Sequence, residues 1–129
     1  MATLFTRIIN GEIPCYKVAE NEKFLAFLDI QPLVKGHVLI IPKIEIDYIF
    51  DLEDDLLADM IVFSKLVSKK IKVAFPCKKV GVTVIGLEVP HAHIHLVPIN
   101  SMTDMNFSNS KLVLEKDDFI DIASRIINS

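Results

Sequence analysis

The most constraining feature of the sequence is a long amphipathic helix expected over residues 51–74. Apolar side chains recur there at steps of four, four, three, four and four residues, the spacing of one helix face: Leu52, Leu56, Met60, Phe63, Val67 and Ile71. Acidic residues crowd its beginning and lysines crowd its end, as the helix dipole favours. A helix with one apolar face buries that face against another layer of structure, so we expect this stripe to be core packing.

Five shorter segments around this helix have the composition of β-strands. They are rich in apolar and β-branched residues and are separated by turn-forming residues: 16–19, 24–30, 36–42, 79–85 and 91–99. Because short links join neighbouring segments and few helices accompany them, we expect an α+β fold with a five-stranded, mainly antiparallel sheet. Two further helices are expected, over residues 3–11, with Thr3 as N-cap and Gly11 as the stop, and over residues 116–127.

Length and composition exclude several classes of protein. The 129 residues contain no repeat or linker, so we expect a single domain over residues 1–129. The formal charge of −3, without a strongly basic stretch, argues against general nucleic-acid binding. The purest apolar run, residues 38–41, is far shorter than the ~20 residues of a membrane span. With 51% hydrophobic residues, the chain is therefore expected to form a homo-oligomer through an apolar interface.

The N-terminus and the cysteines indicate where the protein works. No signal-peptide pattern precedes the first expected helix. Cys15 and Cys77 have neither CxxC spacing nor the spacing of a disulfide framework, so we expect two packed thiols. A cytoplasmic location is the prediction.

The segment that carries chemistry is His91-Ala92-His93-Ile94-His95-Leu96, which holds three of the four histidines. Side chains alternate along a strand, so the three imidazoles share one face and lie roughly 7 Å apart. We expect the apolar face to be the buried one and the imidazoles to line the opposite face.

Two chemistries are open on these residues alone. Neutral imidazole is a common zinc ligand, and His37 could supply a further ligand, although His91 to His95 is a long span for one ion and no HExxH motif is present. The other chemistry is metal-free and acts on phosphate. A neutral imidazole, with an ordinary pKa of about 6.5, is a competent nucleophile, and a protonated neighbour would stabilise the phosphoryl oxygens.

The histidine segment and three further segments, in this order, resemble the histidine triad (HIT) nucleotide-binding family, and its small Hint-like branch in particular. The three segments are residues 4–14, 25–30 and 36–43, and the resemblance covers most of residues 4 to 98. It implies a HIT-like fold with a five-stranded antiparallel sheet, a long helix and a short N-terminal helix, usually as a homodimer through the long helix and a strand. The helix expected over residues 116–127 lies outside the resemblance.

The resemblance also implies roles for individual residues. His93 would attack the α-phosphorus of a nucleotide conjugate, and water would then hydrolyse the covalent nucleotidyl-histidine. His91 and His95 would flank the phosphate, and His37 matches the family's fourth histidine. Asp29 matches the carboxylate that accepts hydrogen bonds from the ribose hydroxyls. Five apolar residues match the slot for a purine base: Leu4, Phe5, Ile8, Phe27 and Ile30.

The sequence departs from the family pattern at two places. The loop 84–90 has one glycine, and Glu88 stands where a small hydroxyl residue is usual. The Glu88 carboxylate would repel a phosphate, or would instead hold one of the three histidines His91, His93 and His95 protonated. The family's metal-binding members carry paired cysteines near the first helix; Thr3 and Thr6 stand here instead, and Glu45 replaces a frequent histidine. We therefore expect no metal and no cofactor.

The leading hypothesis is a metal-independent nucleotide hydrolase or nucleotidyl transferase that acts on a purine nucleotide conjugate. Phosphoramidates, dinucleoside polyphosphates and nucleotidyl esters all remain open as substrates. The alternative is a nucleotide-binding module with little or no catalysis, which the Glu88 loop motivates. A metalloenzyme with a histidine-bearing strand is the third hypothesis. We expect a homodimer, with neither nucleic acid nor a membrane as partner.

Overall fold

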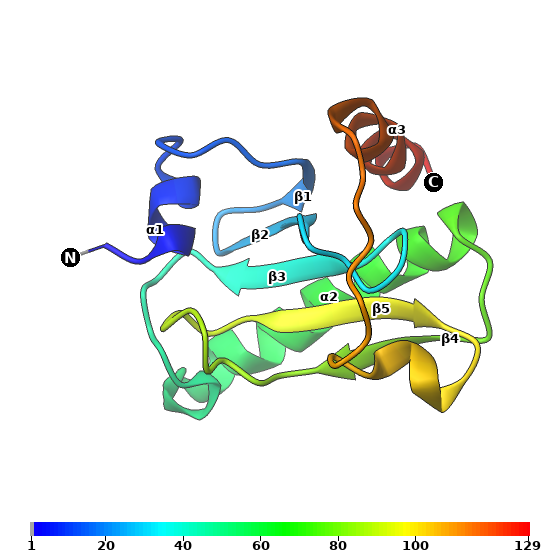
Figure 1. Ribbon diagram of the computed structural model, residues 1–129. Coiled ribbons are helices and arrows are strands. Elements are labelled where there is room, and N and C mark those ends of the chain that lie inside the picture. The colour runs from blue at the N-terminus through cyan, green and yellow to red at the C-terminus, as the bar shows by residue number, and fades with distance from the viewer. Residues whose placement is uncertain (1) are drawn as a thin grey trace.

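Five antiparallel strands form one sheet in the computed structural model, which describes residues 2–129 (Figure 1). The spatial order is β1-β2-β3-β5-β4, and every neighbouring pair is antiparallel. The strands are β1 (Lys17–Glu20), β2 (Phe24–Leu28), β3 (Val38–Pro42), β4 (Lys79–Thr83) and β5 (Ile94–Ile99). The predicted α+β class and five-stranded antiparallel sheet are confirmed.

One face of the sheet packs against α2 (Asp54–Ala74) and α3 (Lys116–Ile127). Figure 1 shows the long α2 running behind the strands. The helix stripe expected from the sequence does enter the core, since four of its side chains are buried against the sheet: Met60, Phe63, Val67 and Ile71. The C-terminal helix adds a second buried set: Phe119, Ile122, Ala123 and Ile126.

The other face is covered by α1 (Leu4–Ile9) and by the chain that follows β5. Thr3 caps α1 by accepting a hydrogen bond from the Thr6 backbone N–H, and Gly11 lies just beyond the helix with φ +77°, so both predicted boundary residues are confirmed. After β5 the chain forms the short 3-10 helix η2 (Met102–Met105) and then crosses the sheet to α3 (Figure 1). The Leu112 N–H donates to the Pro32 carbonyl at 2.9 Å and fastens this crossing.

Several element boundaries differ from the expectation, and those near the centre of the sheet have a clear cause. Strand β5 begins at Ile94, because the Ala92 N–H donates to the Ile46 carbonyl and not to a neighbouring strand of the sheet. Strand β2 ends at Leu28, because the carboxylate of Asp29 accepts the Gln31 N–H and turns the chain. His91 and His93 therefore lie just before a strand, where their backbone groups are free for other contacts.

The remaining boundaries shift by one to three residues. β1 begins at Lys17, β3 begins at Val38 after Gly36 at φ +95°, and β4 ends at Thr83. The long helix starts at Asp54, because Leu52 and Glu53 are extended and a 3-10 turn, η1 (Ile49–Asp51), precedes them. Over residues 2–129, no helix combines the length and the apolar character that crossing a membrane requires.

Candidate active site

A pocket of about 510 Å³ opens on the sheet face that α1 covers. Its walls come from α1, from β2 and the turn after it, from the loop before the histidines, and from the chain after η2. Ten residues predicted from the sequence lie on these walls: Leu4, Phe5, Ile8, Phe27, Asp29, Ile30, His37, Glu88, His93 and His95. The fold thus gathers, around one cavity, nearly all of the residues that the resemblance singled out.

The four histidines are buried. This corrects the expectation that only the apolar face of the segment 91–96 is buried and that its imidazole face is exposed to solvent. His37 and His91 are 1% and 0% exposed, and His93 and His95 are 6% and 8% exposed. Aromatic rings cover them: the Phe5 ring packs edge-on against His93 at 5.0 Å. Residues distant in the sequence provide the rest of the cover, so strand alternation alone could not indicate it.

Hydrogen bonds fix which nitrogen of His37 and of His95 carries a proton. The Leu33 N–H donates to His37 Nδ1 at 3.0 Å, so the proton of neutral His37 is on Nε2. That Nε2–H donates to His95 Nδ1 at 2.9 Å. The remaining His95 nitrogen, Nε2, then carries the proton of the neutral ring and is a donor.

His93 is oriented by the backbone of His91. Its Nδ1–H donates to the His91 carbonyl at 2.7 Å, so the lone pair of the neutral ring is on Nε2. A neutral imidazole that presents its lone pair in a pocket has the form that nucleophilic catalysis requires. His93 lines the cavity, and it is therefore the histidine best prepared to attack a bound electrophile.

His91 lies behind His93 and is not among the residues that line the pocket. Its Nε2–H donates to the Pro42 carbonyl at 2.9 Å, and its Nδ1 accepts from the Thr3 hydroxyl at 2.9 Å. Both ring nitrogens are therefore used inside the protein. The geometry gives His91 a positioning contact with His93, through its carbonyl oxygen.

Burial keeps His37, His91 and His95 neutral. Desolvation, with a smaller repulsion from His95, lowers the pKa of His37 to about 3, and desolvation lowers the pKa of His95 to about 4. Desolvation also lowers the pKa of His91. The lowered pKa values therefore do not support the expectation that a protonated histidine supplies positive charge beside His93 at pH 7, because a buried charge is unfavourable.

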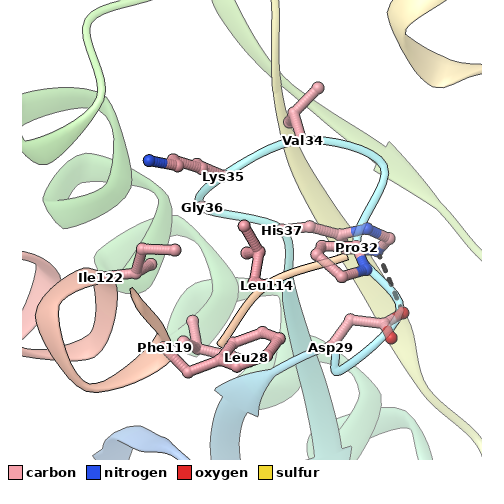
Figure 2. A pocket seen from close by; sticks show the side chains of 10 residues that line it. All are labelled: Leu28, Asp29, Pro32, Val34, Lys35, Gly36, His37, Leu114, Phe119 and Ile122. Atoms are coloured by element: carbon pink, nitrogen blue, oxygen red, sulfur yellow. Dashed lines mark ion pairs between the residues drawn. The ribbon is translucent and has the colours of Figure 1, made fainter. Parts of the chain in front are cut away.

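Asp29 lies at the end of β2 and faces the histidines. One carboxylate oxygen accepts the Gln31 N–H at 2.8 Å, and the other lies 3.5 Å from His37 Nε2. Figure 2 shows Asp29 and His37 at a shallow depression that is lined by the turn after β2 and by α3. Burial raises the pKa of Asp29, although the Gln31 hydrogen bond opposes this.

Asp29, His37 and His95 each place one potential ligand atom within 4.8 Å of the others, so this group has the donor set of a small metal site. The hydrogen bond between His37 Nε2 and His95 Nδ1 already uses two of these atoms. A cation in this position would have to replace that bond. Without a cation, the His37 and His95 nitrogens already satisfy each other through this hydrogen bond.

Thr3, Thr6 and Glu45, which stand where the sequence departs from the pattern of the metal-binding proteins, form a hydrogen-bonded cluster. The Thr3 N–H and the Thr6 hydroxyl both donate to Glu45 Oε1, each at 2.7 Å, while Thr3 contacts His91. These bonds lower the pKa of Glu45, with the Thr3 backbone bond as the largest cause. Glu45 thus ties the start of α1 to the chain after β3 and, through Thr3, to His91.

Among the pocket residues that sequence reasoning did not single out are Phe107 and Lys111. The Phe107 ring packs edge-on against His95 with 4.9 Å between centroids, and it lies 6.1 Å from His37. The Lys111 ammonium donates to the carbonyls of Phe107 and Asn109. A lone phenylalanine in the polar stretch 100–111 was the only signal, and it could not identify what the ring would cover.

Glu88 lies on the pocket wall, but it does not make the expected contact with His91, His93 or His95. Among residues 2–129, its carboxylate makes no hydrogen bond to a histidine. The suggestion that Glu88 holds a ladder histidine protonated is therefore not supported by the geometry.

The fold and the site define a protein of the α+β class in which three buried histidines, His37, His93 and His95, line one pocket beside a five-stranded antiparallel sheet. The model of the HIT domain matches residues 10–102. The adenosine 5'-monophosphoramidase of Saccharomyces cerevisiae is 38% identical over 98 residues, which are 75% of this chain and 62% of the yeast protein. The chain belongs to the HIT family.

Solved structures agree over almost the whole chain. A HIT-like protein from Bartonella henselae has a TM-score of 0.84 at 25% identity, covering 98% of this chain and 95% of that one. A hypothetical histidine triad nucleotide-binding protein from Sulfolobus tokodaii has a TM-score of 0.81 at 30% identity, covering 96% of this chain and 89% of that one. The likeness extends beyond the part that the family model matches.

Proposed function

We propose that this protein is a metal-independent nucleotide hydrolase or nucleotidyl transferase that acts at the α-phosphate of a purine nucleotide conjugate. The hydrogen bond from His93 Nδ1 to the His91 carbonyl carries the proposal, since it leaves the Nε2 lone pair for attack. The name of the yeast relative, adenosine 5'-monophosphoramidase, supports a phosphoramidate as one substrate.

The reaction proceeds in two displacements. His93 Nε2 attacks the α-phosphorus, a P–N bond forms, and the bond to the leaving group breaks with its electron pair on the leaving group. Water, or another acceptor in the transferase case, then attacks the same phosphorus, and the P–N bond breaks with its electron pair on His93 Nε2. The proton that the attacking water or acceptor loses balances the proton that the leaving group takes up. The Nε2–H of His95 donates to a phosphoryl oxygen, which stabilises the charge that develops on the phosphoryl group in each step.

The nucleoside half of the substrate occupies the opposite part of the pocket. Asp29 accepts hydrogen bonds from the ribose hydroxyls. The purine lies in the apolar slot, whose side chains come from α1 and from β2 with the turn after it: Leu4, Phe5, Ile8, Phe27 and Ile30. Apolar walls with a few polar groups are typical of small-molecule sites.

The direct test is AMP release from an adenosine phosphoramidate in excess EDTA, with wild type beside His93→Ala. Wild type should release AMP, and His93→Ala should lose at least about 10³-fold in kcat, as expected when a nucleophile is removed. Lys116→Met, on the surface at the start of α3, is the matched control and should keep full activity. Equal release by wild type and His93→Ala would contradict the assignment.

One observation favours the alternative of a nucleotide-binding module. Glu88 places a carboxylate on the pocket wall, where it would repel a phosphate group. Calorimetry with AMP and GMP, beside turnover assays on a phosphoramidate, a dinucleoside polyphosphate and a nucleotidyl ester, separates the two functions. Binding of the nucleotides without turnover of any substrate would favour the module.

We also propose that residues 1–129 act as one domain and that the protein is a cytoplasmic homodimer. The pocket supports the first proposal, because its wall includes Phe107 and Lys111 from beyond β5. Exposed apolar side chains on α2 support the second: Ile61, Val62, Leu66 and Val73. Neither nucleic acid nor a membrane is proposed as a partner, as the charge and the apolar runs of the sequence indicate.

A further inference from the structure

The segment after β5 brings a lysine into the pocket. Lys111 lies outside the part of the chain that the HIT-domain model matches, residues 10–102, yet it lines the same cavity as His93, His95 and Asp29. Its ammonium is held at the end of a short loop by the carbonyls of Phe107 and Asn109. Because an ammonium has three N–H groups, one remains for a ligand.

The pocket needs positive charge that His37 and His95 do not supply. His37 and His95 are neutral at pH 7, since burial lowers their pKa values to about 3 and about 4. Asp29 and Glu88 add carboxylates to the wall. Among the described residues that line the cavity, Lys111 is the only lysine or arginine. A phosphate group that enters meets one permanent cation.

The loop before the histidines offers no side chain that could replace it. The pocket wall contributed by this loop consists of Ile85, Gly86, Leu87, Glu88 and Val89. Four of these have no polar side-chain group, and an ionised Glu88 accepts hydrogen bonds but cannot donate them. On the described wall of the cavity, the stronger side-chain donors to a phosphate are therefore the histidines, the Gln31 amide and the Lys111 ammonium, and of these only Lys111 is a permanent cation.

The geometry relates Lys111 to the reacting end of the pocket. The Lys111 ammonium lies 5.9 Å from the centroid of the Phe107 ring. The same ring packs against His95 at 4.9 Å. Lys111 also acts electrostatically on the site, since its charge opposes the raised pKa of Asp29 and further lowers the pKa of His37.

We infer that Lys111 binds the phosphate group of the nucleotide and supplies the positive charge beside His93 and His95. The inference rests on the proposed function, since it concerns the same nucleotide in the same pocket. Lysine is a suitable donor here, because its ammonium acts as a point charge on phosphate oxygens. Phe107 is a positioning residue, because its carbonyl holds the ammonium and its ring packs on His95.

Calorimetry with AMP and adenosine tests the inference, because the two ligands differ only in the phosphate. Lys111→Met keeps most of the length and loses the charge. The Kd for AMP should rise about 10-fold or more, in line with the loss of a charge-assisted hydrogen bond. The Kd for adenosine should change much less, because adenosine lacks the phosphate that the ammonium is inferred to bind and Lys111 acts on Asp29 only through its charge. GMP and guanosine form a second pair.

Two control variants separate charge from structure. Lys111→Arg keeps the charge and should recover most of the AMP affinity. Lys116→Met removes a lysine from the surface nearby and should change neither affinity. Thermal melting of each variant checks the fold, because Lys111→Met also removes the bonds to two backbone carbonyls.

The outcomes are distinct. Weaker AMP binding with unchanged adenosine binding supports the inference. Equal weakening of both ligands would overturn it, since Lys111 would then act on the loop or on the nucleoside half. Unchanged binding of both would also overturn it. If wild type binds no purine nucleotide, the proposed function itself fails, whatever the variant does.

Discussion

His37 and His95 are joined by a 2.9 Å hydrogen bond from Nε2 of the first ring to Nδ1 of the second. The bond exists only while His95 is neutral, because a protonated His95 would place a second N–H against the His37 donor. Phe107 covers the pair, and the Leu33 N–H fixes the tautomer. The fold therefore stabilises two neutral imidazoles beside the proposed nucleophile.

The stability of the protein should fall in mild acid. The folded-state pKa of His95 is about 4 and that of His37 is about 3, below the ordinary value of 6.5. Below pH 6.5 the unfolded chain binds protons that the folded chain refuses, so this stability is complete above pH 6.5 and is lost as the pH falls towards 4. Each histidine contributes at most ~1.4 kcal/mol per pH unit. Urea denaturation at pH 7 and pH 5 should show a loss of about 2 kcal/mol or more.

His95→Asn is the matched variant for this measurement. The asparagine carbonyl can accept the His37 hydrogen bond, but it does not titrate. The difference in unfolding free energy between pH 7 and pH 5 should therefore shrink by roughly a third to a half, because His95 is one of three histidines whose pKa burial lowers. A difference as large as that of wild type would show that His95 is not one of the groups responsible.

Thr3→Val should destabilise the protein and slow turnover. Thr3 Oγ1 accepts the Thr6 N–H as the cap of α1 and contacts His91 Nδ1 at 2.9 Å. Valine keeps the shape but removes both contacts, so we expect a loss of about 1–2 kcal/mol in unfolding free energy. Because His91 positions His93, kcat should fall more than KM rises. Thr3→Ser restores the hydroxyl and should restore both stability and kcat.

Asp29→Asn should weaken nucleotide binding through the ribose. An uncharged amide is a poorer acceptor than a carboxylate, so the Kd for AMP should rise about 10-fold. The preference for AMP over 2'-deoxy-AMP should shrink with it, and calorimetry measures both values. Asp47→Asn, at an exposed carboxylate after β3, is the control. An unchanged preference for the ribonucleotide would assign Asp29 another role.

A charge on the exposed face of α2 should break the proposed homodimer. Val62, Leu66 and Val73 lie on one side of this helix, opposite its core stripe, and are 65%, 53% and 69% exposed. Leu66→Glu would bury a carboxylate in an apolar interface, which is strongly unfavourable. Light scattering should give a dimer for wild type and for Lys116→Glu, and a monomer for Leu66→Glu. A monomeric wild type would contradict the proposal.

Much of the fold could be predicted because it depends on local pattern. The apolar repeat along residues 51–74 and the cap at Thr3 are encoded within a few residues of each other, and both are confirmed. The start of β5 at Ile94 was missed, because the Ala92 N–H bonds to Ile46, a partner 46 residues away in the chain. Local alternation carries no information about such a bond.

The environment of the candidate site could be predicted only in part. The histidine spacing indicated His93 and its neighbours, and the fold brings most of the indicated residues to one pocket. The neutrality of His37 and His95 depends on burial by residues such as Phe107. That burial is a tertiary property, so the sequence pattern led to an expectation of a protonated neighbour that the lowered pKa values do not support.

Because of the segment that crosses from η2 to α3, the charge of the pocket and the stability of the sheet depend on different parts of the chain. The sheet holds the histidines, whereas Phe107 and Lys111 lie on irregular chain that contributes no strand to it. Substitutions in this chain can change the charge of the pocket while the hydrogen bonds of β3 with β5 stay intact. The inferred contact with phosphate can therefore be altered with little cost to folding, and variants restricted to residues 106–111 are a compact library for altering it.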